Sequence, residues 1–359
     1  ILDFKSNKKI PESSIVNGKS VAIQYKKEHL IIPDEHLVIG SNKIEIEFIA
    51  GEMSLNRNED YLYTLLVPDR ARTLFPCFDQ PNIKATYLLN ISAPEDWKVL
   101  CGAPLENAKE RGDFVEYQFK ESDRMSTYLF SFVAGKFDAL NSSDTRFKMS
   151  LLHQEKDSIK IQLSTSRIFD LHQQSVDFLE KYTNHNFPFQ KLDYASIYSH
   201  PYGGMEHTGA IQYRQSPLFL DKSATQKQKL RRAKLIAHET AHMWFGNLVT
   251  MQWFSDVWLK EVFANFMADK IVNPQFKSIN HDLSFFIDHY PAAYTIDRSR
   301  GANPIRQNLD NLNNAGSLYG NIIYHKAPIM MRQLESIIGE DNFQKGIIEY
   351  IKAFENDNA

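Results

Sequence analysis

The stretch that decides the fold of this chain is His238-Glu239-Thr240-Ala241-His242, with Glu261 following after eighteen further residues. On a helix, two histidines four positions apart point to the same side, so both imidazoles can reach one ion. Two histidines and a distant carboxylate supply three ligands for a tetrahedral zinc ion and leave the fourth position to water. An open fourth position is typical of catalytic zinc, so the pattern predicts one Zn²⁺ per chain and favours a hydrolase.

Glu239 follows the first histidine and should point toward the same cleft without binding the metal itself. Its expected task is to take a proton from the zinc-bound water and to deliver it later to the leaving amine. The alternative is that the five-residue pattern arose on a helix by chance, and Glu261 on a second predicted helix argues against it. We expect the nearby Trp244, Trp253 and Trp258 to pack in the core and not to contact a substrate.

Composition excludes several classes of protein. The chain has 359 residues, of which 43% are hydrophobic, enough for two or three domains with their own cores. Its formal net charge is -3, so nothing indicates binding to nucleic acid or to anionic membranes through bulk charge. One local basic run precedes the histidine pair and is interpreted as the solvated face of a helix: Lys227, Lys229, Arg231, Arg232 and Lys234.

The sequence carries no disulfide framework and no membrane span. For the two cysteines, Cys77 and Cys101, we favour free thiols over a single bridge. No apolar run approaches the ~18 residues that span a bilayer. No signal peptide is visible, but the chain begins at Ile1, so we expect a processed form or a fragment that could have lost a targeting segment. Nothing in the sequence indicates a compartment or an oligomeric state.

Residues 1–145 are predicted to form an N-terminal antiparallel β-domain. Residues 43–48 alternate apolar and polar side chains with the period of two that a half-buried strand requires. Several short strands separated by turn residues suggest a sandwich or an open, barrel-like sheet. The turns are expected at Asn17-Gly18, Ala93-Pro94 and Arg111-Gly112-Asp113, and further strands at 86–91, 97–100, 114–119, 128–132 and 147–152.

Helical spacing replaces this alternation after about residue 155, and residues 146–359 are predicted to form a second domain. Strands first and helices later are typical of a two-domain chain of β and then α+β class. The predicted helices cover residues 159–182, about 225–245 (ended by Gly246-Asn247), 283–293 and 324–338, with another that is capped by Ser255 or Asp256 and ends before Pro274; strands are expected at 194–198 and 210–213.

Four motifs occur in order along the chain: ARTLFPCFDQP at residues 71–81, PYGGMEH at 201–207, AHMWFGNLVTM at 241–251 with WLKE at 258–261, and YHKA at 324–327. Together they resemble the aminopeptidase N family of gluzincin zinc metallopeptidases. The second motif looks like that family's GxMEN exopeptidase signature, and the last resembles the segment that carries its catalytic tyrosine. Chance is a poor explanation for four ordered motifs.

The resemblance implies a saddle-like N-terminal β-sandwich followed by a thermolysin-like, mostly helical catalytic domain. Family members usually continue into a helical C-terminal domain, which we expect to be absent here, and the first strands correspond to a point partway into the usual N-terminal domain. We therefore expect a chain truncated at both ends. Because the C-terminal domain normally closes over the cleft, such a fragment could bind zinc and still turn over poorly.

The resemblance also implies the site residues. His238, His242 and Glu261 hold the zinc, and Glu239 is the general base. Tyr324 corresponds to the tyrosine whose hydroxyl stabilises the oxyanion, a donor typically worth about a hundred- to a thousandfold in rate.

The predicted substrate site rests on Glu206, which corresponds to the acidic residue that binds the free α-ammonium of a peptide. The backbone at Gly203 and Gly204 should lie along the substrate, since glycine permits close approach. Met205, His207 and Val67 complete the predicted substrate-binding residues. The implied activity is removal of the N-terminal residue of a peptide.

Several positions depart from the family pattern. His207 stands where the signature has asparagine, and its charge near pH 6.5 could alter the pH dependence. Lys260 and Val262 replace the usual asparagine and glycine beside Glu261, which we take as tolerable because neither is a ligand. Leu65 and Val67 are apolar where relatives usually carry polar residues near the substrate amine. We therefore expect a preference for neutral or hydrophobic first residues.

Two other functions compete with the aminopeptidase. One is a related hydrolase that acts as an endopeptidase or on a non-peptide substrate. The other is a non-catalytic fragment that binds zinc or peptide.

Overall fold

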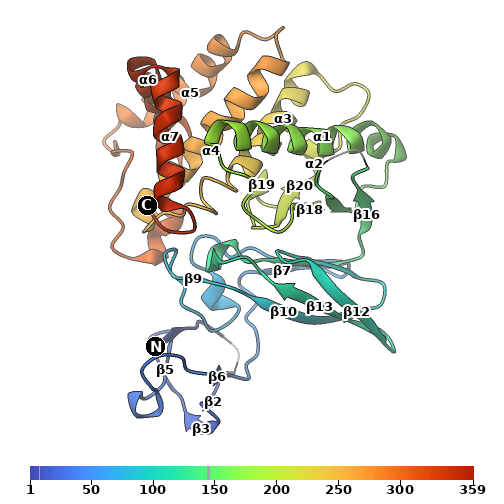
Figure 1. Ribbon diagram of the computed structural model, residues 1–359, viewed down its shortest axis with the longest axis vertical. Coiled ribbons are helices and arrows are strands. Elements are labelled where there is room, and N and C mark those ends of the chain that lie inside the picture. Colours follow the sequence, from blue (N-terminus) through green and yellow to red (C-terminus); the bar gives the residue numbers. More distant parts are fainter. Residues whose placement is uncertain (8, 144–145) are drawn as a thin grey trace.

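The computed structural model describes residues 1–7, 9–143 and 146–359. Small sheets of the N-terminal part lie at one end of an elongated molecule and helices at the other, with a mixed sheet between them (Figure 1). The predicted order of classes, β first and α+β second, is therefore confirmed.

The strands up to Gly135 pair in five antiparallel sheets within the described residues. Asn17 and Gly18 take positive φ angles of 50° and 82°, the geometry that a tight two-residue hairpin needs, and they join β2 to β3 as predicted. The sheets are β1 (Leu2–Asp3), β5 (His29–Ile31) and β4 (Gln24–Lys26); β3 (Lys19–Ala22), β2 (Ser13–Val16) and β6 (Ile44–Glu45); β10 (Leu88–Pro94), β13 (Phe114–Glu121) and β12 (Leu105–Arg111); β11 (Lys98–Cys101), β15 (Phe132–Gly135), β8 (Tyr61–Thr64) and β7 (Leu55–Arg57); and β14 (Met125–Ser126) with β9 (Lys84–Ala85).

Some strand predictions in this part are wrong. The strand predicted at residues 128–132 is wrong except at Phe132, where β15 begins, because a buried 3₁₀ turn at Thr127–Leu129 precedes it; an apolar run by itself does not fix the conformation. The expected turn at Ala93-Pro94 is the end of β10. Strand β12 was not predicted, since all its residues are exposed and no buried face imposes a period of two.

The five-stranded mixed sheet has the order β16-β17-β18-β20-β19. The inner strands β17, β18 and β20 run parallel, and the edge strands β16 and β19 are antiparallel to their neighbours. Strand β16 precedes the predicted domain boundary at residue 145, and its partner β17 follows it, so one sheet contains strands from both sides of residue 145. The boundary itself stays a prediction. The strands are β16 (Asp138–Asn141), β17 (Ser150–His153), β18 (Asp193–Ile197), β19 (Gly204–Met205) and β20 (Ala210–Arg214).

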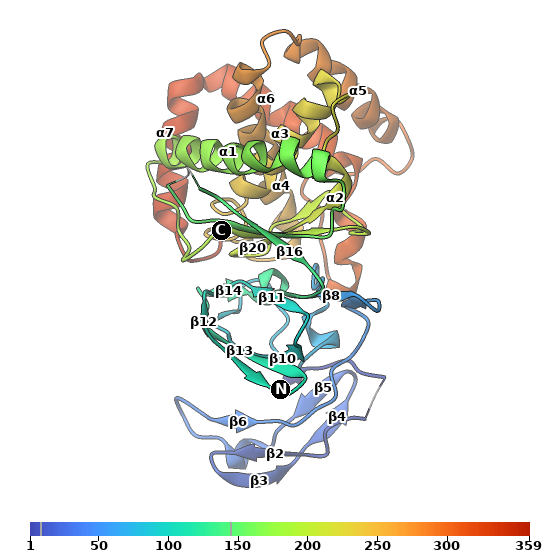
Figure 2. The same cartoon turned by 90° about the vertical axis from the view of Figure 1, so that its right-hand side faces the viewer.

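Helices lie on one side of this sheet and the N-terminal β part lies on the other (Figure 2). Each predicted helix has a counterpart, and α2 and α7 were not predicted. No described helix has both the length and the apolar character needed to cross a membrane. The helices are α1 (Ser158–Thr183), α2 (Gln215–Leu218), α3 (Gln226–Ala241), α4 (Val257–Val272), α5 (His281–Asp297), a π-helix (Ile322–Lys326), α6 (Ala327–Ile338) and α7 (Glu340–Phe354).

Helix α3 begins with a capping box. The Thr225 hydroxyl accepts the backbone N–H of Gln228, and the Gln228 side chain accepts the backbone N–H of Thr225. The helix ends at Ala241, and a turn containing Gly246 with φ 129° follows it. The basic run on this helix is exposed as expected at Lys227, Lys229 and Arg231, but Arg232 is buried and donates to the Leu218 carbonyl.

Two large buried clusters stabilise the molecule. The first lies among α1, α3, α4 and the mixed sheet, and it contains Trp244. The second joins both parts of the chain, with Leu66 and Leu129 from the β part packed with Met205, Phe254 and Ile323. The N-terminal part therefore shares a core with the part that carries the site. Trp253 and Trp258 pack partly buried against these clusters, as predicted, and Cys77 and Cys101 are free thiols.

Candidate metal centre and cleft

Helices α3 and α4 bring the three predicted metal ligands together. The Nε2 atoms of His238 and His242 lie 3.0 Å apart, and Glu261 Oε2 lies 3.7 Å from each of them. Ligand atoms at about 2.0–2.1 Å from one tetrahedral zinc ion are roughly 3.3–3.4 Å from one another. The observed separations lie on either side of this value, so the three residues fit a zinc ion.

Hydrogen bonding prepares His242 for metal binding. Its Nδ1 donates to the Phe245 carbonyl oxygen at 2.9 Å, because a carbonyl can only accept. The lone pair of Nε2 thus faces His238 and Glu261. Metal-bound histidines usually donate their other ring N–H in this way, which fixes the tautomer. Burial, together with His242, lowers the pKa of His238 to about 4, so its ring is neutral at physiological pH.

Glu239 is buried beside the two histidines and within reach of the same ion. Burial raises the pKa of Glu239 well above its usual value, and Glu206 and Glu261 add to the shift. The backbone of β19 lies against this side chain: a Cβ added at Gly204 would be 2.6 Å from Glu239 Cγ. Glycine at this position therefore leaves the space that Glu239 occupies.

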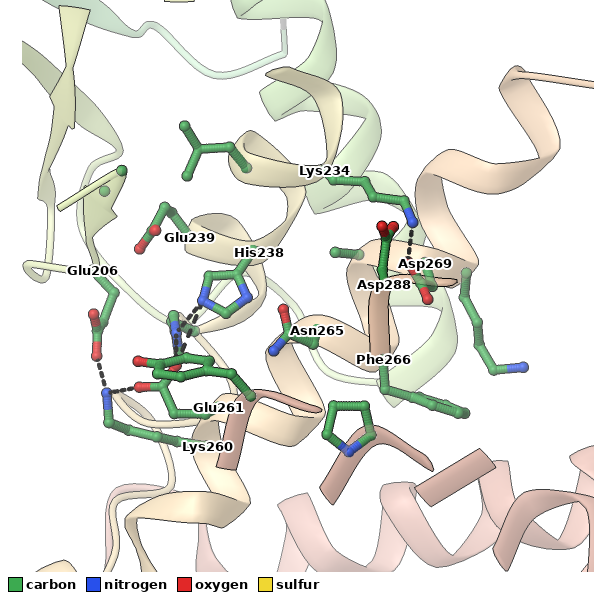
Figure 3. Close-up of a pocket in the computed structure, with 18 of the residues that line it drawn as sticks. Glu206, Lys234, His238, Glu239, Lys260, Glu261, Asn265, Phe266, Asp269 and Asp288 are labelled. Atoms are coloured by element: carbon green, nitrogen blue, oxygen red, sulfur yellow. Dashed lines mark hydrogen bonds and ion pairs between the residues drawn. The ribbon is translucent and has the colours of Figure 1, made fainter. Parts of the chain in front are cut away.

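Lys260 lies between two carboxylates in the centre of the site. Its ammonium donates to Glu206 Oε1 and, at 2.7 Å, to Glu261 Oε1, as Figure 3 shows. Burial alone would raise the pKa of Glu206, but Lys260 and His242 outweigh it and hold that pKa well below its usual range. Whether Lys260 is tolerable, as expected from the sequence, stays a prediction; the structure adds that its side chain contacts both Glu206 and Glu261.

Tyr324 lies half-buried on the π-helix and lines the same cavity. Burial raises the pKa of its hydroxyl well above the usual value, with Glu261 and Tyr319 contributing, so the hydroxyl keeps its proton as a donor must. Tyr319, with its ring centroid 6.5 Å from that of Tyr324, also lines the cavity and was not predicted. On the sequence it carried no signal beyond its distance of five residues from Tyr324.

The site opens into a cavity of about 1120 Å³. It extends from Glu206 and the predicted metal ligands to the charged residues of α4 and α6. Five of the predicted substrate-binding residues line it: Val67, Gly203, Gly204, Met205 and Glu206. None of the three tryptophans near the metal motif is among its described lining residues.

His207 is not brought to the cavity. Its ring is fully buried, with Nδ1 3.3 Å from the Leu129 carbonyl oxygen, and it is not among the described residues that line the cavity. Burial lowers the pKa of His207 to about 3. Its charge therefore does not change near pH 6.5, contrary to the expectation from the sequence. Leu65 is likewise buried away from the cavity, and only Val67 of this pair reaches it.

Comparison with known proteins decides the family. The Peptidase family M1 domain matches residues 167–359, which is more than half of the chain, and the Peptidase M1 N-terminal domain matches residues 24–129. The chain belongs to peptidase family M1. The resemblance inferred from the four motifs is thus confirmed, and the family is one of zinc enzymes, in agreement with the cluster of histidines and glutamates.

Curated aminopeptidases match most of the chain. Probable aminopeptidase 1 of Sulfurisphaera tokodaii is 33% identical over 96% of this chain and 44% of its own length. Leucyl aminopeptidase of Saccharolobus solfataricus is 31% identical over the same shares. The human Endoplasmic reticulum aminopeptidase 2 is 33% identical over 81% of this chain and 30% of its own length. The chain thus spans less than half the length of these relatives.

Proposed function

We propose that this chain carries the active site of a zinc-dependent aminopeptidase, which hydrolyses the N-terminal peptide bond of peptides. The observation that carries the proposal is the position of Glu206, whose buried carboxylate lines the same cavity as His238, His242 and Glu261. A carboxylate fixed at one side of a cleft pairs with a peptide's terminal ammonium and sets the cut one residue in. The family and the names of its aminopeptidase relatives support this substrate class.

His238, His242 and Glu261 are the residues that would hold the zinc. When bound, zinc supplies a Lewis acid that activates water and polarises the substrate carbonyl. Glu239 takes the proton from the attacking water and returns it to the leaving amine. Tyr324 donates its hydroxyl to the developing oxyanion, and Glu206 binds the substrate ammonium. The backbone of Gly203 and Gly204 lies beside the peptide.

The deciding experiment replaces Glu239 by Gln in the zinc-loaded chain. Zinc content, measured by atomic absorption, should stay at one ion per chain, while turnover of an aminoacyl-fluorophore falls by about 10²–10⁴-fold, the usual contribution of a general acid–base residue. Acetylating the substrate's amine should also remove nearly all turnover. Unchanged activity in Glu239→Gln would refute the mechanism, and cleavage of acetylated peptides would favour an endopeptidase.

Tyr324→Phe tests the oxyanion donor separately. The ring keeps its packing, so zinc content and the KM for substrate should change little, while kcat falls by about a hundred- to a thousandfold. A kcat that stays within about threefold of the parent would remove Tyr324 from the mechanism.

We further propose a preference for neutral or hydrophobic first residues. Val67 lines the cavity with an apolar side chain where a polar residue would favour charged substrates, and one relative is named for leucyl substrates. A panel of aminoacyl-fluorophores measures this preference through kcat/KM. A dominant preference for arginine would contradict it.

A further inference from the structure

We propose that Lys260 competes with the substrate's terminal ammonium for Glu206, and so sets how strongly this site recognises a free N-terminus. The inference rests on the proposed aminopeptidase function and names a residue that limits its affinity. It follows from the ion pairs around one buried lysine.

The position of the Lys260 ammonium is closely defined. Only 4% of the residue is exposed, and Nζ contacts Glu206 Oε1 and Glu261 Oε1. The ammonium also lies over the rings of Tyr128 and Tyr319, with centroids 5.7 and 5.9 Å from Nζ. Two carboxylates and two aromatic rings thus stabilise the ammonium in this position.

Glu206 would consequently be shared between Lys260 and the ammonium of a bound peptide. Its Oε1 is paired with Lys260, and the carboxylate lines the cavity from which a peptide would approach. An incoming ammonium meets a carboxylate that is already paired with Lys260, and it also meets the positive charge of Lys260 close by. Buried charges are screened by salt far less than exposed ones, so this repulsion persists at physiological ionic strength. Without Lys260 the same carboxylate would bind an amine more tightly.

Lys260 also contacts the metal ligand. It holds Glu261 Oε1, and Glu261 Oε2 is left 3.7 Å from both histidine Nε2 atoms. A change at Lys260 can therefore alter zinc affinity as well as amine recognition. The experiment has to measure the two effects separately.

The test compares two ligands that differ only in the amine. Leucine hydroxamate and 4-methylpentanohydroxamate are titrated into the zinc-loaded chain by calorimetry, and the ratio of their Kd values gives the advantage of the amine. In Lys260→Met this advantage should grow about tenfold or more, mainly because leucine hydroxamate binds more tightly. Zinc content is measured on the same samples, and each titration is made at full zinc occupancy.

Lys270→Met is the matched control. Lys270 lies on the same helix and lines the same cavity, but it pairs with Glu335 at 2.6 Å and does not contact Glu206. Its removal should leave the advantage of the amine unchanged. Lys260→Arg, which keeps the charge, should also leave the advantage near that of the parent.

The outcomes separate this inference from the proposed function. A parent chain that binds both hydroxamates equally would show that the amine site itself fails. A clear advantage in the parent that stays the same or falls in Lys260→Met would overturn the role of Lys260 alone. If Lys260→Met does not fold, Lys260→Gln decides by the same ratio, because it removes the charge and keeps a donor for the two carboxylates.

Discussion

Single buried side chains show most directly how the fold fixes a charge state. His172 of α1 stacks on Tyr194 with ring centroids 3.8 Å apart. Its Nδ1 lies 2.8 Å from the Ile168 carbonyl oxygen and its Nε2 lies 3.0 Å from the Tyr213 hydroxyl. Because the carbonyl can only accept, Nδ1 carries the proton and Nε2 accepts from tyrosine. The ring is thus held in its neutral form.

This arrangement predicts a loss of stability in acid. Burial lowers the pKa of His172 to about 3, below its value of 6.5 in an unfolded chain. Between these values the unfolded state binds more protons, so the free energy of unfolding falls as the pH drops from 6.5 toward 3. The full effect is of order 4–5 kcal/mol, at about 1.4 kcal/mol per pKa unit.

His172→Gln should therefore destabilise the chain at pH 7 but flatten the acid dependence. The amide keeps one donor and one acceptor and cannot take up the proton. Urea unfolding at pH 7 and pH 4.5 measures how much the free energy of unfolding of each protein changes with pH. Any loss of metal in acid affects both proteins equally and cancels in the comparison. An unchanged slope with pH would contradict this assignment.

At the scale of elements, the site depends on how closely β19 approaches α3. The strand contributes Gly204, and the helix contributes Glu239 one turn from His242. A side chain at Gly204 would occupy the space of Glu239, whereas Gly316, which lines the same cavity, has no atom within 4 Å of an added Cβ. The strand thus limits where Glu239, the proposed general base, can lie.

Gly204→Ala should lower kcat by at least about tenfold, because a misplaced catalytic group reduces rate steeply. Zinc binding should persist, since none of the proposed metal ligands is displaced directly. Gly316→Ala is the control and should keep its kcat within about twofold. Equal kcat values for the two variants would show that the contact with β19 does not position Glu239.

At the scale of the whole molecule, the β part and the helical part share one buried cluster. Leu66 is fully buried in it, beside side chains from both parts. Hydrogen bonds also join the parts: Tyr61 pairs with Ser199 at 2.8 Å, and Gln212 donates to the Thr64 carbonyl at 3.3 Å. We therefore expect the two parts to unfold together.

Leu66→Ala should lower the free energy of unfolding by about 2–5 kcal/mol, the usual cost of truncating a buried leucine. Far-ultraviolet circular dichroism and tryptophan fluorescence should still give one coincident transition. Leu88→Ala, at a side chain that is 66% exposed, should change stability by less than about 0.5 kcal/mol. Two separate transitions in the parent would contradict a shared core.

The sequence predicted what depends on local spacing. The four-residue interval between His238 and His242 put both imidazoles on one side of a helix, and Thr225 marked where that helix begins. Strand prediction failed at residues 128–131, where an apolar run has no alternation of polar and apolar side chains. It also failed at β12, where every side chain is exposed and no alternation is required. Local periodicity reports which face of an element is buried, and it contains no more than that.

The tertiary structure decided which side chains meet. His207 directly follows Glu206, yet its ring turns into the core because the Leu129 carbonyl approaches it from the β part. Lys260 is adjacent to Glu261, and on a helix such neighbours point in different directions. Its long side chain bends toward Glu261 and toward Glu206, which lies fifty-four residues earlier and supplies a second carboxylate. The sequence by itself thus indicated the family and predicted the metal ligands. The charge balance of the site arises from contacts between distant segments, which only the folded chain brings together.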